Sequence, residues 1–320
     1  MSTPGGGEMH QPLPGCFRHQ DRPTGLRCSR CGRPACHECL RQAPVGFHCV
    51  DCIEQERKGA AARMPRAARP GTATAGLRTT LSAHPTVTYA LIGLNVLAYL
   101  ITAVQAGSIL DNNRGSALYE RFALVPGLVA NGEWWRLIGS GFLHFGILHL
   151  AVNMYALYVV GIACENALGK LRYSLVYLVG LLGGSAAVMF GAWNGQTAGA
   201  SGAIFGLFGA VLIILLRLRR NPNMMIAVIV INVIISVSVP GISWLGHLGG
   251  FLAGTAATAA IVYAPEALRA VGMRAPTRKA VVGAGFGVLG ALFVVEIVLI
   301  AVQVASIQDR YALILPHLRF

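Results

Sequence analysis

The chain has 320 residues, of which 54% are hydrophobic and only 12% are charged. A typical soluble domain carries about 25% charged residues, so this composition excludes a soluble globular enzyme, because too little polar surface is available to cover the chain in water. The formal net charge of +13 is typical either of a nucleic-acid-binding patch or of the cytoplasmic loops of a membrane protein.

Charge and cysteine content divide the chain near residue 85. Residues 1–84 hold 12 basic and 6 acidic residues together with seven of the eight cysteines. Residues 85–320 are far more apolar and hold 14 basic and 7 acidic residues. We therefore expect a small polar, cysteine-rich domain followed by an all-α polytopic membrane protein.

The N-terminal domain contains four pairs of metal-binding side chains, and the members of each pair are separated by two residues. The eight predicted ligands are Cys16, His19, Cys28, Cys31, Cys36, Cys39, Cys49 and Cys52. This number is enough for two structural Zn²⁺ ions in tetrahedral sites. Alternation of the pairs predicts a cross-brace, in which the first and third pairs bind one ion and the second and fourth bind the other. His48 is an alternative to Cys49, and disulfides are an alternative that a cytoplasmic location disfavours.

This arrangement, over residues 16–52, resembles B-box-type zinc fingers. Residues 1–52 are assigned to the zinc-binding module, and residues 53–84, rich in Arg, Ala, Pro, Gly and Thr, to a flexible basic linker. The module could bind a cytoplasmic protein partner, bind nucleic acid through its arginines, or serve as a folded cap. We favour the protein partner over nucleic acid, because the basic residues are scattered and no aromatic–basic stripe is present.

Seven apolar stretches of about 17–25 residues follow, each long enough as a helix to cross roughly 30 Å of hydrocarbon. They are predicted at residues 87–106, 145–163, 171–191, 200–216, 224–241, 244–263 and 281–304. All are expected to be helical, because an isolated span must satisfy its own backbone hydrogen bonds. The first six belong to a core at residues 85–265, and the seventh follows a basic loop within residues 266–320.

The distribution of basic residues predicts a multi-pass protein of the cell membrane with a cytoplasmic N-terminus. In that orientation nine basic residues lie in inner loops, namely Lys170, Arg172, Arg217, Arg219, Arg220, Arg269, Arg274, Arg278 and Lys279. Only Arg114, Arg121 and Arg136 lie in outer loops, each with an acidic residue nearby. The net charge is thus mainly an orientation signal.

Four polar side chains on three predicted spans are expected at similar depth, near the extracytoplasmic side. His149 and Asn153 lie four residues apart on the second span, Ser201 opens the fourth, and His247 opens the sixth. Polar side chains are costly in a bilayer and point to function there. Small-xxx-small ridges beside them would let the fourth and sixth helices pack closely. These ridges consist of Gly202 and Gly206 on one helix, and Gly246, Gly250 and Gly254 on the other.

This constellation predicts acyl-transfer chemistry. A serine hydroxyl becomes nucleophilic when a neighbouring imidazole accepts its proton, so His247 is the expected general base for Ser201. His149 and Asn153 can donate to a developing oxyanion, assisted by the backbone N–H of Ser201. No carboxylate stands beside these groups in the sequence, which indicates a Ser–His dyad.

Four sequence motifs carry a family resemblance: Glu133-Trp134-Trp135-Arg136, His144 followed by His149 and Asn153, Gly-Ala-Ser-Gly at 199–202, and Gly-His-Leu-Gly-Gly at 246–250. With these motifs, residues 85–265 resemble the rhomboid family of intramembrane serine proteases. The resemblance implies a six-helix core that opens laterally and cleaves transmembrane protein substrates within the lipid bilayer. It implies Ser201 as nucleophile, His247 as base, and His149, Asn153 and the Ser201 amide as the oxyanion site. The seventh helix would be the addition of the six-plus-one subgroup.

Two positions depart from the family pattern without touching the dyad. Phe205 stands where some members have a tyrosine stacked on the catalytic histidine, and Gly246 stands where alanine often precedes it. The alternative functions are a proteolytically inactive rhomboid-like protein that binds membrane clients, and a transporter. The intact dyad disfavours the first, and the lack of a convincing internal repeat disfavours the second. His144 is assigned a structural role, while Glu296 either contacts the core or snorkels outward.

Overall fold

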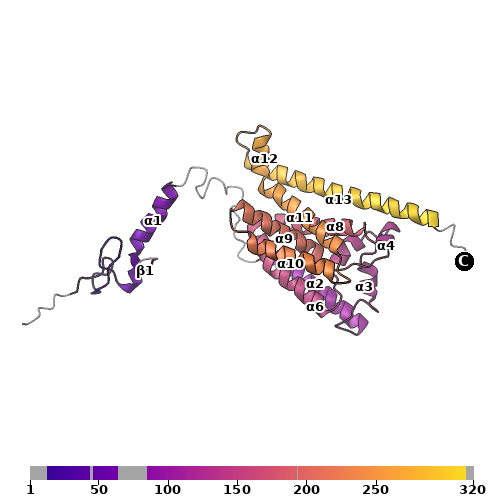
Figure 1. Ribbon diagram of the computed structural model, residues 1–320, viewed down its shortest axis with the longest axis horizontal. Coiled ribbons are helices and arrows are strands. Elements are labelled where there is room, and N and C mark those ends of the chain that lie inside the picture. Colours follow the sequence, from indigo (N-terminus) through magenta and orange to yellow (C-terminus); the bar gives the residue numbers. More distant parts are fainter. Residues whose placement is uncertain (1–12, 44–45, 64–84, 193, 315–320) are drawn as a thin grey trace, which may run out of the picture. The chain divides into compact units, whose positions relative to one another are not determined.

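The computed structural model describes residues 13–43, 46–63, 85–192 and 194–314 (Figure 1). The chain divides into two compact units, Met1–Ala75 and Gly76–Phe320. Residues 64–84, which belong to the predicted linker, lie outside the described residues.

The N-terminal unit is a small cysteine-rich fold. It contains η1 (His37–Cys39), the strands β1 (Leu40–Gln42) and β2 (Phe47–Cys49), and α1 (Val50–Arg63). The two strands pair antiparallel, with Leu40 opposite Cys49. The core consists mainly of buried cysteines. Residues 53–63, predicted as the start of the linker, are helical instead, because this stretch is rich in Glu, Gln, Arg and Ala, which favour helix.

The second unit is a helical bundle with a helix at each of the seven predicted spans. The helices are α2 (Thr86–Ala106), the run of α6 (Ile147–Ala156), the π-helical η4 (Leu157–Gly161) and α7 (Ile162–Leu168), then α8 (Lys170–Val188), α9 (Ser201–Arg217), α10 (Asn223–Ser238), α11 (Trp244–Val262) and α13 (Arg278–Ile314). Five of them are long and apolar enough to cross a membrane, and α9 and α10 are shorter apolar helices. The chain is therefore a mostly helical, multi-span membrane protein.

Short helices occupy two of the predicted loops. The loop after α2 contains α3 (Ala117–Phe122), α4 (Pro126–Ala130), α5 (Arg136–Gly139) and the 3₁₀ turn η3 (Ser140–Phe142). The predicted basic loop contains α12 (Ala264–Ala270). Arg136 is buried in the first of these loops and donates to the carbonyl oxygens of Glu120 and Ala123, each at 2.7 Å. Because it also pairs with Glu133 at 2.6 Å, its charge is compensated.

Two sets of polar contacts each bring a pair of helix ends together. Glu165, near the end of α7, accepts hydrogen bonds from the backbone N–H groups of Val87 (3.1 Å) and Thr88 (2.8 Å) at the start of α2. Arg217, at the end of α9, pairs with Glu266 of α12 at 2.5 Å, directly after α11. The start of α2 therefore lies beside the end of α7, and the end of α9 lies near the end of α11.

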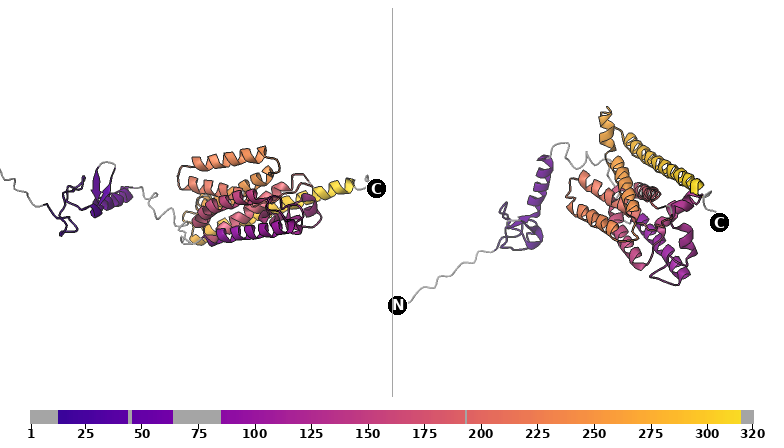
Figure 2. Two further views of the ribbon diagram at one scale, coloured as in Figure 1. Left: turned by 90° about the horizontal axis from the view of Figure 1, so that it is seen from below. Right: turned by 45° about the vertical axis from the view of Figure 1, so that its right-hand side comes forward.

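Helix α13 runs along the outside of the bundle and packs on α8 and α11 (Figures 1 and 2). It extends beyond the predicted 281–304, and its last turns reach α4. There Ile307 belongs to a buried cluster that includes Val129 and Ala130. The side-chain amide of Gln308 donates to the carbonyl oxygen of Ala130 at 2.7 Å. The seventh helix is thereby attached to the loop that contains Arg136.

Candidate active site

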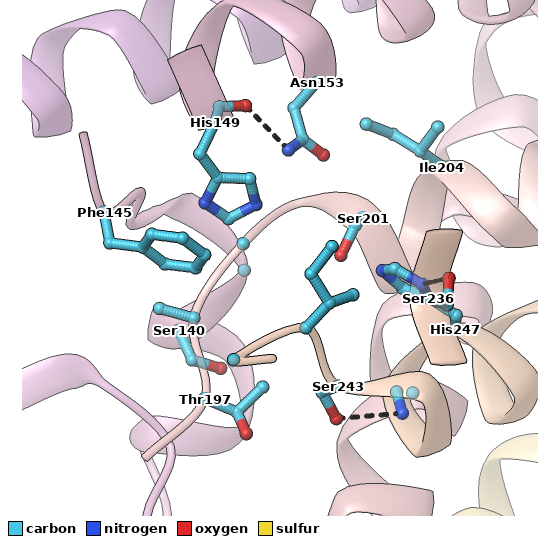
Figure 3. A pocket seen from close by; sticks show the side chains of 18 of the residues that line it. Ser140, Phe145, His149, Asn153, Thr197, Ser201, Ile204, Ser236, Ser243 and His247 are labelled. Atoms are coloured by element: carbon cyan, nitrogen blue, oxygen red, sulfur yellow. Dashed lines mark hydrogen bonds between the residues drawn. The ribbon is translucent and has the colours of Figure 1, made fainter. Parts of the chain in front are cut away.

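A cavity of about 730 Å³ lies among α6, α9, α10 and α11, and the four predicted catalytic side chains line it (Figure 3). Ser201 comes from α9, His247 from α11, and His149 and Asn153 from α6. Residues far apart in the sequence thus meet at one cavity, whose walls also include the loop residues 196–199 and 239–243.

Ser201 is the first residue of α9, after the N-cap Ala200. The first N–H groups of a helix have no intrahelical acceptor, and the partial positive charge of the helix dipole lies at this end. The hydroxyl of Ser201 and its own backbone N–H therefore lie where a negative charge is favoured. This position arises because the chain arrives through Gly199, whose φ of 137° is one that other residues rarely adopt.

Glycine-to-glycine packing brings His247 beside Ser201. A β-carbon on Gly202 would lie 3.3 Å from the carbonyl oxygen of Gly246, so the residues adjacent to the dyad touch. Lower on the same helices, a β-carbon on Gly254 would overlap the backbone of Gly206. The predicted ridges on α9 and α11 therefore do meet.

The imidazole of His247 is stacked on Phe205, one turn after Ser201. The two ring centroids are 4.0 Å apart, with an angle of 11° between the ring planes. Figure 3 shows the Ser201 hydroxyl turned toward the His247 ring. Among the described residues His247 makes a side-chain hydrogen bond through Nδ1 and none to Ser201. Such catalytic hydrogen bonds commonly tighten only when substrate is bound.

His149 and Asn153 face the same space from α6. The Asn153 amide donates to the His149 carbonyl oxygen at 2.9 Å, which leaves its second N–H available to the cavity. A β-carbon on Gly199 would lie 3.1 Å from His149 Nε2 and 3.6 Å from Ser201 Oγ. The His149 imidazole and the Ser201 hydroxyl therefore both lie next to Gly199. An oxyanion formed on a substrate bonded to Ser201 would be within reach of the His149 ring.

Of two other singled-out residues, His144 lies beside the site and Glu296 lies against α8. His144 is fully buried and its ring packs against that of His149, with 4.9 Å between centroids. Glu296 is buried on α13, and its Oε1 would lie 3.1 Å from a β-carbon on Gly183 of α8. Of the two alternatives for Glu296, it contacts the core and does not snorkel outward.

Ser236 on α10 is a residue at the site that was not predicted from the sequence. Its hydroxyl lies 2.5 Å from Nδ1 of His247. The available signal was the pair Asn232 and Ser236, four residues apart on an otherwise almost wholly apolar helix. Spacing alone gives the face of the helix that they share, but not the helix that this face meets.

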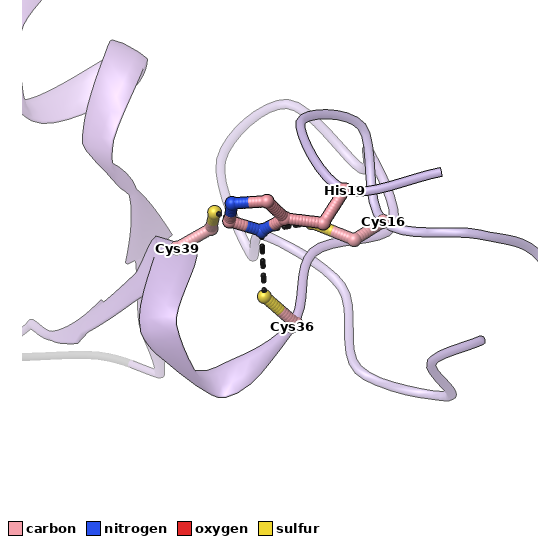
Figure 4. Close-up of side chains that lie close together, drawn as sticks. All are labelled: Cys16, His19, Cys36 and Cys39. Carbon is pink, nitrogen blue, oxygen red and sulfur yellow. Dashed lines mark hydrogen bonds between the residues drawn. The ribbon is translucent and has the colours of Figure 1, made fainter. Parts of the chain in front are cut away.

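The N-terminal unit gathers the eight candidate ligands into two tetrads. One contains Cys16, His19, Cys36 and Cys39, the other Cys28, Cys31, Cys49 and Cys52, and the ligand atoms of each lie within 4.8 Å of one another. In the first, His19 Nδ1 lies 3.4 Å from Cys36 Sγ and 3.5 Å from Cys39 Sγ (Figure 4). His48 belongs to neither tetrad. The described cysteines are all free thiols, so both tetrads can hold a metal ion.

The second tetrad carries its own supporting donors. The backbone N–H of Cys49 donates to Cys28 Sγ at 3.1 Å, and Arg33 Nε donates to Cys31 Sγ at 3.4 Å. The hydrogen bond from Arg33 lowers the pKa of Cys31 to about 6. Donors of this kind stabilise thiolates, the form of cysteine that binds metals.

Known proteins resemble the membrane unit. Residues 131–264 match the Rhomboid domain family. The chain is 39% identical over 183 residues to rhomboid protease GluP of Bacillus subtilis (strain 168), covering 55% of this chain and 35% of GluP. It is 31% identical over 219 residues to rhomboid protease AarA of Providencia stuartii, covering 57% of this chain and 75% of AarA. RHOMBOID-like protein 4 of Arabidopsis thaliana is 34% identical over 136 residues, 34% of its length. The chain thus spans about a third of GluP and of the Arabidopsis relative.

Proposed function

The chain belongs to the rhomboid family, and from this premise we propose that it is an intramembrane serine endopeptidase that cleaves transmembrane protein substrates. The observation that carries the proposal is the meeting of Ser201, His247, His149 and Asn153 at one cavity. Each side chain supplies a group that acyl transfer requires: a nucleophile, a base and oxyanion donors.

In the proposed reaction Ser201 Oγ attacks the carbonyl carbon of the scissile peptide bond while His247 Nε2 accepts the hydroxyl proton. The carbonyl oxygen becomes an oxyanion, which accepts hydrogen bonds from the Ser201 N–H and from the side chains of His149 and Asn153. When the C–N bond breaks, His247 protonates the leaving amine. A water molecule, deprotonated by His247, then hydrolyses the acyl-enzyme ester and regenerates Ser201.

Labelling by a fluorophosphonate probe and cleavage of a transmembrane substrate, both in proteoliposomes, test this proposal. The wild type is expected to be labelled at Ser201, and Ser201→Ala is expected to lose both labelling and cleavage. His247→Ala should lower both rates by about 10²- to 10⁴-fold, the usual contribution of a general base. A Ser201→Ala protein that still cleaves would contradict the dyad. A wild type that binds membrane clients but neither labels nor cleaves would favour the inactive rhomboid-like alternative.

The proposed orientation places the N-terminus in the cytoplasm and the cavity toward the extracytoplasmic side of the cell membrane. Its support is the excess of basic residues in the loops on the same side as the start of α2. Ser201 opens its helix at the opposite end from Arg217, the last residue of α9. The hydrolytic water would therefore enter from outside.

For the N-terminal unit the proposal is two structural Zn²⁺ ions in a B-box-like, cross-braced module that binds a cytoplasmic protein partner. Tetrahedral Zn²⁺ with Zn–S bonds of about 2.3 Å requires sulfur atoms about 3.8 Å apart. The Cys28–Cys52 and Cys31–Cys49 separations of 3.9 and 3.7 Å agree with this geometry. Three thiolates with one imidazole, as in the first tetrad, and four thiolates, as in the second, both favour zinc over harder cations.

The metal content of the full chain tests the zinc assignment. The wild type should carry two zinc ions, and Cys36→Ser and Cys49→Ser should each lose one. His48→Ala is the matched control and should keep both, because His48 lies outside the tetrads. Loss of zinc from His48→Ala, or a wild type without zinc, would overturn the assignment.

A further inference from the structure

The hydroxyl group of Ser236 connects α10 to the dyad. Ser236 Oγ lies 2.6 Å from the carbonyl oxygen of Asn232, one turn earlier on α10, and 2.5 Å from Nδ1 of His247 on α11 (Figure 3). Ser236 is 95% buried, since its relative exposure is 5%. Ser236 also lines the cavity, so its hydroxyl lies at the wall of the site.

The two contacts together favour one arrangement of the protons, since the donor at Nδ1 depends on the tautomer of His247. A carbonyl oxygen can only accept, so the single hydroxyl proton of Ser236 is donated to Asn232. The oxygen of Ser236 must then accept the hydrogen bond from His247, which requires a proton on Nδ1. A neutral imidazole has one N–H, so its Nε2 is left with a free lone pair.

We propose that Ser236 is a positioning residue for the general base: it holds His247 in the tautomer and orientation in which Nε2 can accept the proton of Ser201. This inference rests on the proposed Ser201–His247 dyad. When Ser201 Oγ attacks the substrate carbonyl, its proton moves to Nε2, and the imidazolium keeps donating Nδ1–H to Ser236. Ser236 stays neutral throughout and forms no bond with the substrate.

Two further observations support a positioning role rather than packing alone. The stack on Phe205 fixes the plane of the His247 ring but is equally compatible with a 180° flip of the ring and with either tautomer, and the bond to Ser236 selects one of these arrangements. In addition, α10 has only two buried side chains, Met225 and Ser236. One of these two buried side chains is therefore the one that accepts the hydrogen bond from Nδ1 of His247.

The test compares Ser236→Ala and Ser236→Thr with Ser238→Ala, which removes an exposed hydroxyl from the same helix. The assays are fluorophosphonate labelling, cleavage of a transmembrane substrate with kcat and KM measured separately, and thermal unfolding. Misplacement of a catalytic group by about 1 Å costs up to about 100-fold, so Ser236→Ala should lower kcat and the labelling rate by about 10- to 100-fold. KM and the unfolding temperature should match those of Ser238→Ala, and Ser236→Thr should recover most of the rate.

Equal rates for Ser236→Ala and Ser238→Ala would overturn the inference while leaving the dyad intact. A fall in the unfolding temperature and a rise in KM, with kcat unchanged, would assign Ser236 to packing and overturn it too. If Ser236→Ala does not fold, Ser236→Cys replaces it, because sulfur fills the site but is a weak acceptor. Equal kcat values and labelling rates for Ser236→Thr and Ser236→Cys would then refute the inference. Failure of the wild type itself to label or cleave would instead refute the proposed function.

Discussion

Gly199 determines how closely His149 approaches Ser201, the proposed nucleophile. A β-carbon at this position would lie 2.9 Å from Cε1 and 3.1 Å from Nε2 of His149, closer than ordinary carbon contacts. The imidazole also packs against the rings of Phe145 and His144, so a β-carbon on Gly199 would require these rings to shift as well. The glycine is therefore required for the oxyanion site as well as for its backbone conformation.

Gly199→Ala is expected to lower kcat for substrate cleavage by about 100-fold, because it displaces an oxyanion donor. The matched control is Gly132→Ala. Gly132 also has a positive φ, 101°, but nothing lies within 4 Å of its β-carbon position. Both variants carry backbone strain of about 1–2 kcal/mol, so similar losses of kcat would contradict a specific role of Gly199 at the site.

At the level of single residues, motif and spacing predicted that Ser201 and His247 lie close together, and both line one cavity, whereas Ser236 was missed. Ser201 and His247 are recognisable because each opens an apolar helix beside a glycine ridge, and the ridges determine which helices meet. Ser236 has no such local mark. Its role depends on which residue of a neighbouring helix it contacts. The loop between α10 and α11 and the packing of the bundle decide that contact.

At the scale of helices, the contact between α9 and α11 is the feature that assembles the site. A β-carbon on Gly250 would overlap the carbonyl oxygen of Gly202, the residue after the nucleophile. Close backbone approach of this kind is how membrane helices associate without a hydrophobic driving force.

Gly250→Ala should force α9 and α11 apart and lower the free energy of unfolding by about 1–3 kcal/mol, the usual cost of overpacking. The labelling rate of Ser201 should fall with it. Gly287→Ala on α13 serves as the control, because nothing lies within 4 Å of its β-carbon position. That variant should be neutral or stabilising by up to about 1 kcal/mol. Thermal unfolding in detergent measures the stability of both variants. Indistinguishable unfolding curves would show that α9 and α11 are not in close contact at Gly250.

The end of α13 shows why one helix boundary could not be predicted. Apolar composition ends near residue 304, and Gln308, Asp309 and Arg310 then resemble a loop. The helix nevertheless continues to Ile314, about 55 Å for its 37 residues at 1.5 Å each. Ile307 and Gln308 contact α4. These contacts join residues far apart in the sequence, so no local pattern predicts them.

This contact predicts that Ile307→Asp releases the end of α13 from α4. Ile307 is 4% exposed, so an aspartate there would be a buried, unpaired charge, which is strongly destabilising. Hydrogen exchange of residues 124–131 should become faster. Ala305→Asp, two residues earlier and exposed, should leave their exchange unchanged. If the two variants exchange alike, α13 does not restrain the loop.

At the scale of the whole molecule, the contacts between helix ends are compatible with the charge-based orientation that we propose. The start of α2 lies beside the end of α7, and the end of α9 is paired with α12 after α11. The nine basic residues assigned to inner loops follow or precede these same helix ends. Because charge and helix connectivity agree, the orientation predicts opposite exposure for two loops that can be compared directly.

Gly115 and Gly272 are suitable positions for this comparison. Both are exposed loop glycines with positive φ, and nothing lies within 4 Å of their β-carbon positions. A site for a sequence-specific protease inserted after Gly115 should be cut in right-side-out vesicles, and one inserted after Gly272 only in inverted vesicles. Retained fluorophosphonate labelling of each uncut variant would show that the insertion leaves the fold intact. The reverse pattern would place Ser201 near the cytoplasm and the N-terminal cysteines outside, where disulfides, not zinc, would be expected.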